Sequence, residues 1–123
     1  MNIAPFNVEV QSVDGGVGAF VVTGELDQAT AGELREPLQE AINGGTRAVM
    51  IDMTDCGFID STGLGVIVEA WKALEDRDGD GREVGLSICC PEPEVRRLME
   101  VTGLDQAISI LNTREEAIAA LQP

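Results

Sequence analysis

The chain has 123 residues, of which 44% are hydrophobic, and this content supports a packed core within one domain. Its net charge of −14, from 22 acidic and 8 basic residues, repels nucleic acid and anionic membranes, so we expect neither as a partner. A basic protein surface suits this charge better, although the charge can also serve solubility alone.

The chain begins with a pattern that predicts a β-hairpin. Apolar residues alternate with polar ones over 6–13, which is typical of a half-buried strand. Asp14-Gly15-Gly16 predicts a turn, and 17–23 predicts the second strand of the hairpin.

A helix and a buried strand are expected next. Thr30 and Glu33 form a capping-box pattern that opens a helix, which Asn43-Gly44-Gly45 ends. Pro37 lies inside this helix and should kink it or remove a hydrogen bond. The nearly continuous apolar run 47–53 favours a central strand that is covered on both faces.

A hydroxyl residue then stands at a predicted strand-to-helix corner, in the stretch Asp60-Ser61-Thr62-Gly63-Leu64-Gly65. An amphipathic helix follows and runs through Leu74. Free N–H groups and the positive dipole end of a helix N-terminus accommodate an anion. Ser61 therefore lies where a ligand phosphate, or a phosphorylated side chain, is tolerated. Capping of the helix by Asp60 or Ser61 is the plain structural alternative.

The same stretch does not fit two enzyme motifs. A nucleophile elbow needs Gly-x-Ser-x-Gly and a His elsewhere, whereas this frame begins with Ile59 and the chain has no His. A P-loop needs a Gly-Lys pair that is missing here. We expect no catalytic residue. Gly63 and Gly65 each cost a helix about 1 kcal/mol relative to Ala, which indicates that a backbone, either of the sheet or of a partner, approaches closely here.

The remaining elements complete an alternating pattern. A strand is expected over 83–90, a helix over 91–101 and a short strand over 107–111, and a second capping box, Thr113 with Glu116, opens a last helix. The order is then β-β-α-β-α-β-α-β-α. It predicts an α/β fold with a mixed, largely parallel sheet.

The cysteines bear on location and on metals. Cys56, Cys89 and Cys90 are an odd set with an adjacent pair, which is untypical of a secreted disulfide framework. Three Cys at this spacing, without a His, match no zinc pattern. Neither a signal peptide nor a membrane span is visible. We expect one reduced, cytoplasmic domain over 1–123, with buried structural thiols, no metal and no cofactor.

An acidic stretch, Asp76-Arg77-Asp78-Gly79-Asp80-Gly81, resembles the first half of an EF-hand loop. Its twelfth position is Ser87 rather than the bidentate glutamate, and the stretch leads into a strand rather than a helix. A solvent-exposed acidic loop explains it better. A calcium or small-ligand sensor remains an alternative.

Two motifs resemble those of the anti-sigma factor antagonists, single-domain proteins of the STAS fold. Thr23-Gly24-Glu25-Leu26-Asp27 resembles the family motif after the second strand, and 58–66 resembles the central motif. The stretch from Cys90 to Leu104 fits the family's third helix and its cap. The resemblance covers nearly the whole chain. It implies a STAS-type mixed β-sheet with helices packed on it.

The resemblance also implies a function. In this family the first hydroxyl residue after the aspartate is phosphorylated by a serine kinase that is itself the anti-sigma factor, which makes Ser61 the phosphoacceptor. The unphosphorylated form binds this kinase and releases the sigma factor, and a PP2C-type phosphatase restores it. The free protein is expected to be a monomer. The implied partner-binding residues are Gly24, Glu25, Leu26, Asp27, Asp60, Ser61, Thr62, Gly63, Leu64 and Gly65.

A STAS module of another regulatory complex, or of a transporter-associated complex, is the other alternative. In this alternative the fold is the same and the partner protein is different.

Overall fold

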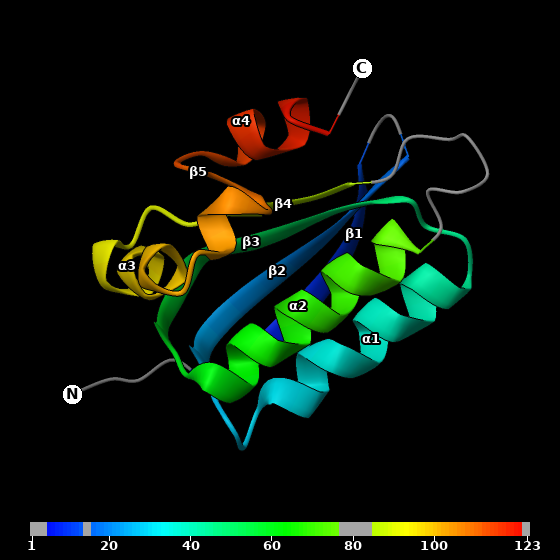
Figure 1. Ribbon diagram of the computed structural model, residues 1–123. Coiled ribbons are helices and arrows are strands. Elements are labelled where there is room, and N and C mark those ends of the chain that lie inside the picture. Colours follow the sequence, from blue (N-terminus) through cyan, green and yellow to red (C-terminus); the bar gives the residue numbers. More distant parts are fainter. Residues whose placement is uncertain (1–4, 14–15, 77–84, 122–123) are drawn as a thin grey trace.

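A five-stranded mixed sheet organises the chain (Figure 1), which we describe from a computed structural model over residues 5–13, 16–76 and 85–121. The strands follow the order β1-β2-β3-β4-β5; the first pair is antiparallel and the other three pairs are parallel. This arrangement confirms the predicted mixed α/β fold. The strands are β1 (Asn7–Val13), β2 (Val17–Leu26), β3 (Ala48–Ile59), β4 (Gly85–Cys89) and β5 (Ser109–Leu111). The helices are α1 (Ala31–Asn43), α2 (Ser61–Glu75), α3 (Pro93–Val101) and α4 (Arg114–Ala119), with a short 3-10 helix, η2 (Leu104–Gln106).

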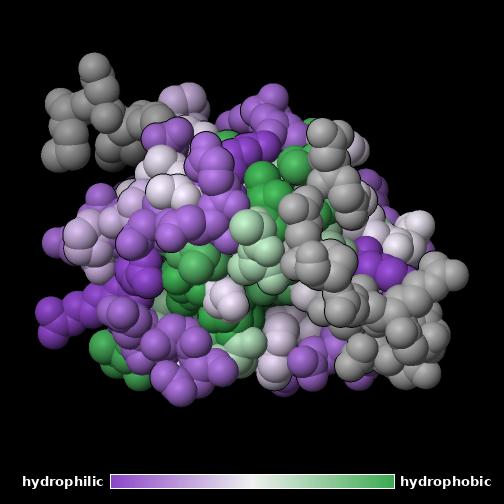
Figure 2. Space-filling view, turned by 90° about the horizontal axis from the view of Figure 1, so that it is seen from above, coloured by the Kyte–Doolittle hydropathy of each residue, from purple (hydrophilic) through white to green (hydrophobic). Residues whose placement is uncertain are grey.

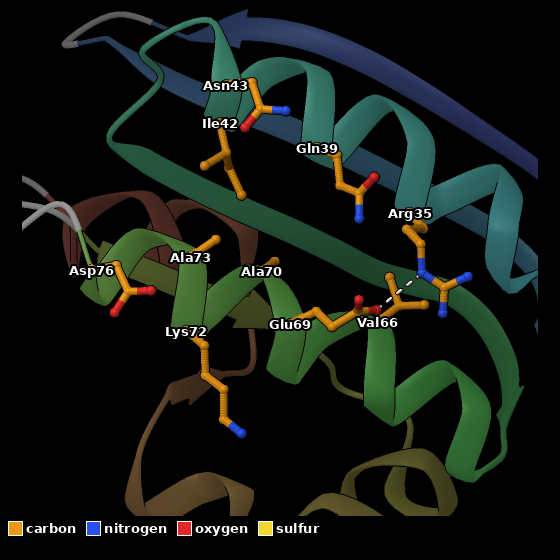
Figure 3. A pocket seen from close by; sticks show the side chains of 10 residues that line it. All are labelled: Arg35, Gln39, Ile42, Asn43, Val66, Glu69, Ala70, Lys72, Ala73 and Asp76. Carbon is orange, nitrogen blue, oxygen red and sulfur yellow. Dashed lines mark hydrogen bonds and ion pairs between the residues drawn. The ribbon is translucent and has the colours of Figure 1, made fainter.

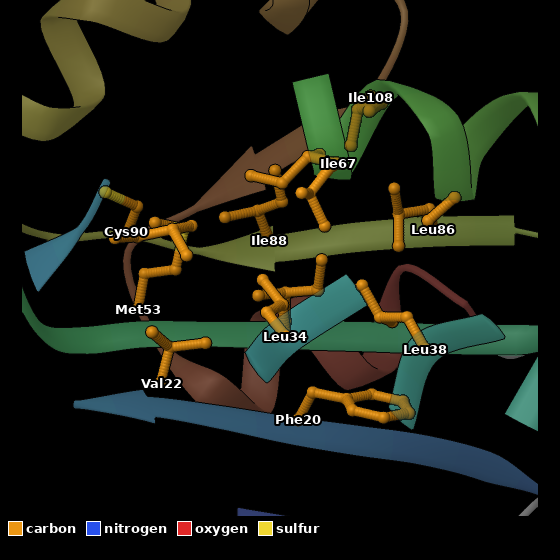
Figure 4. Packing of buried hydrophobic residues seen from close by; sticks show 14 of the residues in the cluster. Phe20, Val22, Leu34, Leu38, Met53, Ile67, Leu86, Ile88, Cys90 and Ile108 are labelled. Atoms are coloured by element: carbon orange, nitrogen blue, oxygen red, sulfur yellow. The ribbon is translucent and has the colours of Figure 1, made fainter. Parts of the chain in front are cut away.

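Helices cover both faces of the sheet. In Figure 1, α1 and α2 lie side by side along one face, and α4 lies on the opposite side of β4. The larger apolar core fills the space between the sheet, α1 and α2, and includes Phe20, Leu38 and Ile88 (Figure 4). A smaller cluster lies under α4 and is anchored by the Ser87 hydroxyl, which donates to the carbonyl of Ala117 at 2.7 Å.

The central strand is buried on both faces, as its apolar run predicts. Val49 and Ile51 belong to the larger core, whereas Met50 points into the cluster under α4. Side chains of a strand alternate between faces, so a strand enclosed by two layers must be apolar at successive positions.

Two strands are longer than predicted. β2 continues to Leu26 rather than residue 23, and β3 continues to Ile59 rather than residue 53. Their extensions pair with each other through register shifts, Thr23 with Asp55 and Leu26 with Ile59. Hydrogen bonds to the neighbouring strand hold polar residues such as Asp55 in β3. The local hydrophobic pattern does not predict a strand at such residues.

Several predicted helix signals agree with the structure. The Thr113 hydroxyl accepts the Glu116 N–H at 3.1 Å, which confirms the capping box of α4. Gly103 ends α3 with a left-handed φ of 79°, as expected of a C-terminal glycine. α1 continues through Pro37 and ends at Asn43, as predicted. Of the predicted hairpin turn Asp14-Gly15-Gly16, residues 14–15 lie outside the described residues.

The surface is largely hydrophilic, as the charge of the chain requires. Seen from above, hydrophobic side chains gather in the middle of the face, and many hydrophilic ones lie to the left of them and below (Figure 2). Within the described ranges, none of the helices combines the length and the apolar character needed to cross a membrane.

Candidate functional site

Asp60 holds the corner between β3 and α2. Its Oδ1 accepts the Gly63 N–H at 3.0 Å, which makes Asp60 the N-cap of α2. Its Oδ2 accepts the N–H of Gln28 at 3.1 Å, and its own N–H donates to the carbonyl of Leu26 at 3.2 Å. The capping alternative is therefore confirmed for Asp60. The N-cap of α2 therefore does not need the Ser61 side chain.

Ser61 is the first residue of α2 and is exposed. Its hydroxyl makes no hydrogen bond with any residue that the structure describes. The first N–H groups of a helix have no partner within it. Asp60 takes up the N–H of Gly63, so those of Ser61 and Thr62 remain for an anion, together with the positive dipole end of the helix.

The loop after β2 is tied into a compact turn. The Thr30 hydroxyl donates to the carbonyl of Glu25 at 2.7 Å and accepts the N–H of Asp27 at 2.9 Å. The Asp27 carboxylate accepts the N–H of Ala29 at 2.9 Å. Thr30 makes no cap hydrogen bond to α1, so the capping box predicted with Glu33 is wrong. The hydroxyl is taken by the loop instead, as Thr side chains often are in turns.

The two segments with family-like motifs lie next to each other. The Leu26 carbonyl and the Gln28 N–H both bind Asp60, so the loop after β2 and the start of α2 form one structural unit. We call these residues, 24–28 and 60–65, the Ser61 corner. The sequence does not predict the contribution of Gln28, because it is made by a backbone N–H, which leaves no signal in the side-chain pattern.

The two glycines of the Ser61 corner have different surroundings. A Cβ on Gly63 would lie 2.8 Å from the Leu26 carbonyl oxygen and 2.9 Å from Ile59 Cγ1. A Cβ on Gly65 would meet nothing within 4 Å. Gly63 therefore permits the approach of α2 to the sheet, whereas Gly65 leaves open space at the surface.

The remaining predicted site residues differ in exposure. Glu25 is exposed like Ser61 and Gly65, whereas Asp27, Thr62 and Leu64 are partly buried. Gly24 is buried and takes a left-handed φ of 96° within β2, which favours glycine. Leu26 and Gly63 are buried too. A partner would meet the exposed members, while the buried members hold the corner in shape.

The cysteines are structural. All three are free and buried. Burial raises the pKa of the Cys56 and Cys89 thiols, and raises that of Cys90 to about 11. These thiols stay protonated at neutral pH, which does not suit a reactive nucleophile. In the part of the chain that the structure describes, no group of three His, Cys, Asp or Glu residues could hold a metal ion.

A separate groove of about 340 Å³ runs between α1 and α2 (Figure 3). Arg35 Nε lies 3.0 Å from Glu69 Oε2 across it, and Val66 and Ala70 form part of its wall. Both charged side chains are substantially exposed, so this pair contributes little to stability. Asp76 reaches the groove, but the rest of the acidic stretch through Gly81 lies outside the described residues.

Removal of the Asp60 side chain should loosen the corner. We expect Asp60→Ala to lower the free energy of unfolding by about 1–2 kcal/mol, because the cap of α2 is lost. Asp60→Asn keeps one acceptor oxygen for the two N–H donors, so its free energy of unfolding should lie between those of the wild type and Asp60→Ala. Urea unfolding followed by circular dichroism measures both changes. An alanine variant as stable as the wild type would contradict the role assigned to Asp60.

The chain is similar to known proteins over most of its length. A family model described as the STAS domain matches residues 8–117. The anti-sigma-B factor antagonist of Listeria monocytogenes serovar 1/2a is 35% identical over 116 residues, which are 94% of this chain and 95% of that protein.

Solved structures show the same architecture. The crystal structure of an anti-sigma factor antagonist from Mycobacterium paratuberculosis superposes with a TM-score of 0.84 at 27% identity, over 95% of this chain and 94% of that chain. The Bacillus cell fate determinant SpoIIAA in its phosphorylated form superposes with a TM-score of 0.72 at 22% identity, over 94% of this chain and all of that one (100%). The second likeness concerns the fold alone.

Proposed function

The chain belongs to the STAS domain family, among the anti-sigma factor antagonists, and we propose that it regulates transcription by partner switching through Ser61. Unphosphorylated, it binds an anti-sigma factor and thereby releases a sigma factor. A phosphate on Ser61 ends this binding. The observation that carries the proposal is the Ser61 hydroxyl, which is exposed at the start of α2 because Asp60 makes the cap.

The local geometry favours a phosphate on Ser61. A phosphate adds about −1.5 to −2 charges at pH 7. The N–H groups of Ser61 and Thr62 and the dipole of α2 favour this charge, although the Asp60 carboxylate opposes it. The fold should therefore survive modification nearly unchanged. SpoIIAA, which has the same fold, exists in a phosphorylated form, and this supports a phosphate on such a scaffold.

The switch then acts at the partner's surface. A phosphate must be desolvated when a partner covers it, and it repels acidic groups of that partner. A loss of about 3 kcal/mol in binding free energy weakens a complex by more than about a hundredfold. Burial of one phosphate without full compensation is enough for that loss.

The kinase that phosphorylates Ser61 is the anti-sigma factor itself, and a PP2C-type phosphatase removes the phosphate. The kinase supplies ATP, magnesium and the catalytic base. The chain acts as a binding protein rather than as an enzyme. The free protein is a cytoplasmic monomer.

The test compares the two forms of the protein with one anti-sigma factor kinase from the same genome. Calorimetric titration with ADP present should detect a complex of the unphosphorylated protein. The form phosphorylated on Ser61, verified by peptide mass mapping, should bind more than about a hundredfold more weakly. Equal affinity of the two forms, or no complex with the unphosphorylated form, would overturn the proposal.

A further inference from the structure

An apolar groove opens next to the Ser61 corner, between the end of β3 and α3. It has a volume of about 330 Å³. It shares no residue with 24–28 or 60–65. Its lining consists of Gly57, Phe58, Ile59, Glu94, Val95 and Leu98.

Phe58 is the exposed aromatic residue of this groove. It is 46% exposed, whereas Ile59 and Val95 are buried and form the floor. A free aromatic surface is unfavourable in water, since burial of apolar area contributes about 25 cal/mol per Å². Phe58 comes two residues before Asp60, so a partner that covers Ser61 lies close enough to cover Phe58 as well.

The groove also has no side chain in its wall at Gly57. A Cβ added to this glycine would meet nothing within 4 Å. The Cys56 thiol donates to the Phe58 carbonyl at 3.2 Å and helps to hold the backbone on either side of Gly57. The groove therefore has open space at Gly57, beside Phe58.

Two acidic residues lie at the groove or beside it. Glu94 lines it, and Glu25 is the β2 neighbour that pairs with Phe58. None of the described residues that line it is basic. An apolar floor with an acidic rim is complementary to an apolar side chain flanked by Lys or Arg. A second copy of this chain does not fit, because two molecules of charge −14 repel each other.

We propose that this groove, beside the Ser61 corner, receives an apolar side chain from a basic segment of the anti-sigma factor. The inference rests on the proposed function and extends it to a second contact, which involves α3. Buried aromatic anchors carry much of the binding free energy of an interface, and charges at the rim act mainly on the association rate. Phe58 is thus the anchor, and Glu94 steers the partner.

The experiment measures binding of the unphosphorylated protein to the anti-sigma factor kinase by calorimetry. Phe58→Ala should weaken the complex by about tenfold or more. Gly57→Leu, which adds bulk at a residue that lines the groove and has open space beside it, should weaken it similarly. Val10→Ala is the matched control, because Val10 is 55% exposed on the distant edge strand β1. Its affinity should equal that of the wild type.

The role of the Glu94 charge is tested by the association rate of the complex. Glu94→Gln should slow association and flatten its dependence on salt, whereas Glu40→Gln, on the exposed face of α1, should change neither. If the wild type binds the kinase, and Phe58→Ala and Gly57→Leu both bind it with the same affinity as the wild type, the groove proposal is overturned and the proposed function stays intact. No complex with the wild type would overturn both. Thermal unfolding of each variant identifies any loss of fold.

Discussion

Ser61→Ala is expected to keep the fold and the binding of the anti-sigma factor, and to abolish phosphorylation. The Ser61 hydroxyl is exposed and makes no hydrogen bond with the described residues, so its removal breaks nothing. Alanine is also the best helix former, which suits the first position of α2. Intact-mass analysis after incubation with the kinase and ATP should show one added phosphate on the wild type and none on the variant.

Two further variants make this result specific. Thr62→Ala removes the neighbouring hydroxyl and should still accept one phosphate. Ser61→Asp places a permanent negative charge at the start of α2 and should bind the anti-sigma factor about tenfold or more weakly, since part of the phosphate's charge is reproduced. Unchanged incorporation of phosphate into Ser61→Ala would move the acceptor to another residue.

Gly63→Ala should destabilise the protein by about 2 kcal/mol, because a Cβ there overpacks the junction of α2 and the sheet. The close neighbour is the Leu26 carbonyl oxygen, at 2.8 Å, which is backbone within β2 and cannot rotate away as a side chain could. A shift of α2 would also disturb Asp60, which binds both Leu26 and Gly63. Loss of anti-sigma factor binding should accompany the loss of stability.

Gly65→Ala is the matched control on the same helix. Its new Cβ meets open space, so the gain in helix propensity should raise stability by up to about 1 kcal/mol. Urea unfolding of the two variants separates the effects. Equal stability of Gly63→Ala and Gly65→Ala would show that the sheet does not require a glycine at 63. Weaker partner binding by a stable Gly65→Ala variant would locate the partner's backbone at this position.

Much of the fold could be read from local patterns. The apolar run 47–53 and the amphipathic helix after Asp60 carry their periodicity in adjacent residues, and Thr113 carries its cap signal three residues before Glu116. The position of Ser61 between an aspartate and a glycine was visible in the same way. Periodicity and capping depend on neighbours within one or two turns, so one sequence is enough to recognise them.

Contacts between distant segments could not be read in this way. The extension of β3 to Ile59 depends on pairing with β2, and the turn around Thr30 depends on the path of the chain after that pairing. Asp60 could have capped α2 alone, but the fold also gives it the N–H of Gln28.

The Ser61 corner therefore has two origins. Residue types near 61 decide that a hydroxyl follows a capping acid at a helix start, because this depends on local hydrogen bonding. The pairing of β2 with β3 decides that Gly63 is compressed against Leu26 while Gly65 is open, although the two glycines look alike in the sequence. Packing between segments more than thirty residues apart separates their roles, since steric contact depends on tertiary distance rather than on spacing along the chain.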